Sequence, residues 1–94
     1  MTQDYLIGEV SVCLQRLEAA AGHEAIGDVV RLRREVEAGP LAGLAAAVAR
    51  ALAVADGLCW ASLARRDTEA FTGQAQAAAE LRQFAVCARL IADN

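Results

Sequence analysis

The 94-residue chain is near the lower end of ordinary domain size, which predicts a single domain over residues 1–94. Its hydrophobic fraction is 56%, but much of this is alanine, which favours helix strongly and buries little apolar area, so we expect a lean core. The formal net charge of −3 argues against binding to nucleic-acid phosphates, which requires clustered positive charge.

Apolar residues at helical spacing predict two helices before the Gly39-Pro40 break. The first covers residues 3–21, and the second covers residues 24–38 with Arg33 beside its apolar face and Glu37 one turn later as an ion-pair partner. The sequence leaves open whether the two helices separate at Gly22 or pack as an irregular pair. The apolar stripes are Leu6, Ile7, Val10, Cys13, Leu14, Leu17 and Ala21 in the first helix and Ala25, Ile26, Val29, Leu32 and Val36 in the second.

Two longer helices are predicted after the break, over residues 41–64 and 68–92, and Asp67 or Thr68 is suited to cap the second of them. No stretch alternates polar and apolar residues as a strand would, and short connections favour antiparallel neighbours. We therefore predict an all-α, antiparallel four-helix bundle made of two helical hairpins with Ala-rich helices. The expected inner faces are Leu41, Leu44, Val48, Leu52, Ala55, Cys59 and Leu63, and then Ala70, Ala77, Leu81, Phe84, Ala85, Ala88 and Ile91.

Small residues recur every four positions on the other side of the 41–64 helix, and Trp60 stands beside them. Such a row lets another backbone approach closely along an i±4 ridge, although a chain so rich in alanine also produces such rows by composition alone. Two apolar residues of the last helix lie off its main stripe and extend the candidate interface. The predicted interface residues are Ala49, Ala53, Gly57, Trp60, Ala61, Val86 and Leu90.

Chemistry-bearing residues are few and scattered. His23 is the sole histidine, no Glu-x-x-His motif is present, and Cys13, Cys59 and Cys87 show no C-x-x-C spacing. We interpret the cysteines as buried packing residues. One helical turn carries three arginines, Arg31, Arg33 and Arg34. Acidic residues surround it, which indicates a solvated, ion-paired face. We predict no metal site, no cofactor and no enzymatic activity.

Arg16 and His23, with six residues between them, form a pair that resembles the arginine–histidine motif of HEPN ribonucleases, and this resemblance would imply RNA cleavage. The stretch from Leu63 to Phe71 looks like the turn of a tetratricopeptide-type helical hairpin, which implies a hairpin there. An Ala-rich bundle also leaves room for an apolar ligand between helices, near Trp60 or Phe84. The ribonuclease and small-ligand hypotheses are therefore alternatives to the hypothesis of a protein–protein interaction module.

The N-terminal residues lack the basic and long apolar regions of a signal peptide. Arg50 and Asp56 interrupt the longest apolar stretch, so we expect no membrane insertion and a cytoplasmic protein. All nine Lys+Arg residues are arginine, which suggests a high-GC bacterial genome. The function we predict is a small, non-catalytic, helical protein–protein interaction module that forms a homo-oligomer, most simply a homodimer, or binds another helical protein, and binds no nucleic acid.

Overall fold

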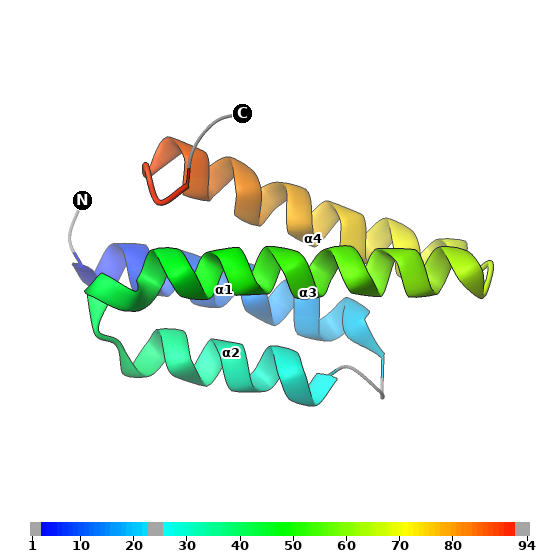
Figure 1. The fold of residues 1–94 in the computed structure, drawn as a ribbon, viewed down its shortest axis with the longest axis horizontal. Coiled ribbons are helices and arrows are strands. Elements are labelled where there is room, and N and C mark those ends of the chain that lie inside the picture. Colours follow the sequence, from blue (N-terminus) through cyan, green and yellow to red (C-terminus); the bar gives the residue numbers. More distant parts are fainter. Residues whose placement is uncertain (1–2, 23–25, 92–94) are drawn as a thin grey trace.

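A computed structural model describes residues 3–22 and 26–91 of the chain. These residues form α1 (Gln3–Ala21), α2 (Ile26–Ala38), a 3-10 turn (Leu41–Gly43), α3 (Leu44–Ala64) and α4 (Thr68–Cys87). Successive helices run in opposite directions, with α1 packed between α2 and α4, and α3 packed on α4 and less extensively on α2 (Figure 1). The predicted all-α antiparallel four-helix bundle is confirmed.

The core consists of one cluster of leucine and valine side chains and many alanines. Its largest fully buried apolar side chains are Val10, Leu14, Leu17, Val29, Leu44, Val48 and Leu81. Buried alanines such as Ala51, Ala55 and Ala85 allow the helices to approach closely. One close approach involves Gly73 of α4, where an added Cβ would lie 3.2 Å from the Cβ of Ala20 on α1. The absence of a side chain at Gly73 therefore sets how near α1 and α4 lie.

The helix ends follow the turn residues. Gly39 has a positive φ of 75° after α2, and the carboxylate of Asp67 accepts a hydrogen bond of 3.1 Å from the Ala70 N–H at the start of α4, so the predicted cap is confirmed. The predicted end of the last helix at residue 92 is wrong. Arg89 adopts a φ of 61° and the Leu90 N–H donates to the Ala85 carbonyl over 2.8 Å, which closes α4 at Cys87.

One helix start differs from the sequence prediction. The third helix begins at Leu44, because residues 41–43 form the 3-10 turn. The first described residue of α2 is Ile26, and residues 23–25 of the predicted second helix lie outside the described residues. The first two helices do separate near Gly22, which has a φ of 81°.

The inner face predicted for α3 is wrong in its last two turns. Leu63 is 45% exposed and Cys59 is half-buried, whereas Ser62 is fully buried. The predicted stripe advanced mostly by four residues at a time, but an α-helix turns once in 3.6 residues, so a strict four-residue step drifts away from the core. Ile26, also predicted to face the core, is 41% exposed.

Candidate functional site

The small-residue face of α3, which we define as Ala49, Ala53, Gly57, Trp60 and Ala61, is exposed along its whole length. Trp60 is 73% exposed, the largest exposed fraction among the large exposed hydrophobic side chains of the described residues. A Cβ added to Gly57 would meet nothing within 4 Å. No other part of the described chain covers this face, so it offers a smooth helix surface with one aromatic side chain near its C-terminal end.

Opposite charges flank the small-residue face. Arg50 lies beside Ala49 and Ala53, and its guanidinium binds the carboxylate of Glu35 on α2 over 2.6 Å. Asp56 is exposed one helical turn before Trp60. The face therefore combines a basic group at its N-terminal half and an acidic group at its C-terminal half.

The other two predicted interface residues lie at the end of α4. Val86 is half-buried in the last turn of α4, and Leu90 follows the helix and packs partly against the core. Each offers only part of its side chain to a partner. Leu90 therefore contributes to the fold of the C-terminal segment as well as to its surface.

A buried polar pair joins three helices and was not predicted. The Ser62 hydroxyl donates a 2.7 Å hydrogen bond to Oε1 of Gln74, and Nε2 of Gln74 donates a 2.8 Å hydrogen bond to the Ala20 carbonyl. Ser62 and Gln74 are 0% and 1% exposed. Both polar ends of the amide are satisfied, so the pair is a structural connection between α1, α3 and α4 rather than an open site.

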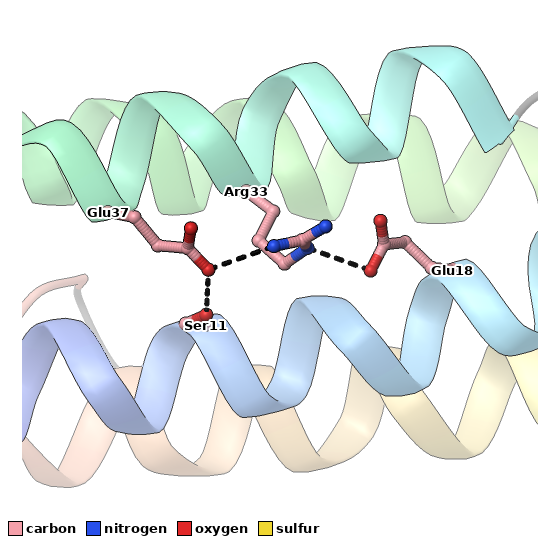
Figure 2. Close-up of polar contacts among 4 residues, drawn as sticks. All are labelled: Ser11, Glu18, Arg33 and Glu37. Atoms are coloured by element: carbon pink, nitrogen blue, oxygen red, sulfur yellow. Dashed lines mark hydrogen bonds and ion pairs between the residues drawn. The ribbon is translucent and has the colours of Figure 1, made fainter.

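Arg33 joins α1 and α2, as Figure 2 shows. Its guanidinium lies between Glu18, at 2.9 Å, and Glu37, at 3.0 Å, and the Ser11 hydroxyl donates a 2.7 Å hydrogen bond to Glu37. These donors, first Ser11 and then Arg33, hold the pKa of Glu37 below its ordinary value. The predicted Arg33–Glu37 pair is confirmed, and its carboxylates already have partners, so this cluster holds α2 on α1.

The cysteines occupy three different environments. Cys13 is buried, Cys59 is half-buried and Cys87 is exposed, and none forms a disulfide. Burial raises the pKa of the Cys13 and Cys59 thiols, and at Cys59 the nearby Asp56 raises it further. The interpretation as packing residues fits Cys13, whereas Cys87 lies on the surface.

The Arg16–His23 pair of the ribonuclease hypothesis lies only in part within the described residues. Arg16 forms an ion pair with Glu80 of α4, and His23 lies outside the described residues. Within residues 3–22 and 26–91, no three His, Cys, Asp or Glu side chains gather as they would around a metal ion.

Shallow depressions mark the surface between helices. One, of about 590 Å³, lies between α1 and α4 and is lined by Arg16, Gly22, Asp67 and Glu69 among others. Another, of about 270 Å³, lies where α2 meets α3. Neither is lined by Trp60 or Phe84, the residues around which an apolar ligand was expected. Phe84 packs against Tyr5, with ring centroids 6.3 Å apart.

The segment Leu41–Ala64 is long and apolar enough to cross a membrane by length and composition alone. Its most apolar 18-residue window has a mean hydropathy of 1.6, and 33% of this window is buried inside the bundle. Core helices of soluble proteins meet the same two criteria. Two of the alanines that contribute to this hydropathy, Ala49 and Ala53, belong to the small-residue face.

The comparisons with protein families, with curated proteins and with solved structures gave no match to this chain.

Proposed function

We propose that this protein is a non-catalytic helical interaction module that self-associates through the small-residue face of α3. The observation that supports this most is the position of Trp60, 73% exposed beside a row of exposed small residues. Tryptophan is enriched among the residues that dominate binding energy at interfaces, and small residues allow a helix to approach closely around it.

Self-association would also stabilise a lean fold. A domain of this size buries a modest fraction of its surface, and its alanine-rich core contributes little apolar area per residue. Covering the α3 face with a second copy would bury further apolar area.

Sedimentation equilibrium of the wild type and of Trp60→Ala tests the proposal. A tryptophan that dominates binding at an interface contributes at least about 2 kcal/mol, and a symmetric dimer contains two, so the substitution is expected to weaken dimerisation roughly a thousandfold. Val12→Ala is the matched control, because Val12 is an apolar residue 41% exposed on α1. A wild type that stays monomeric at high concentration, or a Trp60→Ala variant that dimerises as well as the wild type, contradicts the proposal.

The sole tryptophan provides a second readout. If Trp60 enters an interface, its fluorescence emission is expected to shift to longer wavelength when the wild type is diluted into the monomer. An emission maximum independent of concentration across the sedimentation transition would place the interface elsewhere.

A further inference from the structure

On the exposed face of α3, residues that precede Ala53 are complementary to residues that follow it at the same distance. In an antiparallel pair of α3 helices with a two-fold axis beside Ala53, residues equally far before and after Ala53 come to the same level. Ala49 and Gly57 lie four residues on either side, and Ala46 and Trp60 lie seven residues on either side. The centre thus pairs small residues with small residues, and the ends pair Trp60 with an exposed alanine.

The charges follow the same order. Arg50 lies three residues before Ala53 and Asp56 lies three residues after it, so the antiparallel arrangement brings opposite charges to one level across the contact. Arg50 can bind a second carboxylate besides Glu35, because a guanidinium has five N–H donors. A parallel pair in register would instead place Arg50 against Arg50, Asp56 against Asp56, and the two Trp60 rings at one level.

A depression of about 270 Å³ lies beside Ala46, the residue at whose level Trp60 of the second copy would arrive. It is lined by residues that include Ala46, Ala47 and Arg50 of α3 and Glu35 of α2, and by Gly39, Pro40 and Gly43 of the connection between the two helices. Within one chain, Trp60 and Ala46 are separated by about 21 Å along α3 at 1.5 Å per residue, so Trp60 does not fill the depression of its own molecule. The Glu35 carboxylate offers an acceptor for the indole N–H, and the Arg50 guanidinium offers a cation to the ring.

We infer that two copies of this chain pair antiparallel through α3, with Ala53 at the two-fold axis and each Trp60 seated against Ala46 in the α2–α3 depression of the other copy. This inference rests on the self-association proposed above and adds its orientation, its register and the site that receives Trp60. The surfaces are the same on both copies, so the assembly closes as a dimer rather than growing.

Disulfide cross-linking tests the orientation and register. In a Cys59→Ser, Cys87→Ser background that retains the buried Cys13, Ala53→Cys and Ala46→Cys are introduced one at a time at exposed positions. A disulfide requires Cα atoms about 4.4–6.8 Å apart. We expect Ala53→Cys to form a dimer band on a non-reducing gel and Ala46→Cys to form none, whereas a mixture of Ala49→Cys and Gly57→Cys chains forms the mixed dimer.

Each result separates the two proposals. A dimer that cross-links through Ala46→Cys is parallel, and a dimer that cross-links at none of these positions uses another surface or register. Both results overturn the inferred orientation and register. Self-association itself is tested separately, by sedimentation. A monomeric wild type removes both proposals.

Filling the depression gives an independent test without cysteines. Ala46→Trp blocks the seat of the incoming Trp60 and is expected to abolish the dimer in sedimentation, whereas Ala79→Trp, at an exposed alanine of α4, is expected to leave it intact. Equal dimerisation of the two variants would overturn the proposed seat of Trp60.

Discussion

Replacing Ser62 with alanine should destabilise the bundle although it removes a single oxygen atom. The Ser62 hydroxyl is the donor to Oε1 of Gln74 at 2.7 Å, and both residues are almost completely excluded from solvent. Without the Ser62 hydroxyl, Oε1 of Gln74 is a buried acceptor that has lost its donor, which lowers the free energy of unfolding by about 1–3 kcal/mol. In a domain of this size each kcal/mol lowers the melting temperature by about 4–8 °C, so we expect a fall of roughly 4–24 °C.

A double-mutant cycle with Gln74→Met measures the connection itself. Gln74→Met keeps the volume but leaves the Ser62 hydroxyl without its acceptor and the Ala20 carbonyl without its donor, so it should cost at least as much as Ser62→Ala. The double variant should be more stable than the sum of the single costs predicts, by about 1 kcal/mol, because no donor or acceptor remains between positions 62 and 74. Urea and thermal unfolding followed by circular dichroism at one protein concentration provide the values.

Thr72→Ala is the control, since it removes a hydroxyl that is hydrogen-bonded to the Thr68 carbonyl but lies on the exposed side of α4. Its cost should stay within about 0.5 kcal/mol. A Ser62→Ala variant as stable as Thr72→Ala, or single costs that add without coupling, would refute the reasoning that the buried pair connects the helices.

Three further predictions concern the surface. Arg66→Gly should raise the melting temperature, because Arg66 has a φ of 58°, which costs a residue with a Cβ about 1–2 kcal/mol, whereas Arg65→Gly, at a φ of −85°, should not; equal effects would contradict this. Glu37→Gln should destabilise the protein at pH 7 and lose its effect as the pH falls below about 4, since a lowered pKa in the folded state stabilises only while the carboxylate is charged; a pH-independent difference would contradict this. Mass spectrometry of iodoacetamide-treated native protein should find Cys87 modified first and Cys13 last, because burial shields Cys13 and raises its thiol pKa; the reverse order would contradict this.

The helices and their order follow from the sequence because their boundaries are marked by unambiguous residues. Gly39 with its positive φ and Asp67 with its capping carboxylate end and begin helices as their chemistry requires. The end of α4 was missed because Arg89, which adopts the left-handed conformation there, is a residue type that gives no such signal.

The exposed α3 surface was predicted from spacing alone, whereas the buried polar pair was not. Ser62 and Gln74 are polar, and the inner faces were predicted from apolar residues alone. Their positions contained the missing signal, since Gln74 lies four residues after Ala70 and three before Ala77, in register with the buried stripe of α4. The depression that would receive Trp60 could not be predicted from the sequence, because it forms between α2 and α3 and depends on how these two helices pack.

The Gln74 amide has a consequence for how the helices are aligned lengthwise. Methyl groups project little from a helix, so alanine-rich surfaces have shallow ridges, and one such helix can slide along its neighbour by a turn of about 5.4 Å with small loss of contact. A hydrogen bond is directional and forms at one offset only. Because the amide bonds Ser62 on one helix and the Ala20 carbonyl on another, slippage of either helix leaves a buried dipole unmatched. One glutamine thus selects a single alignment for helices whose apolar surfaces alone would accept several.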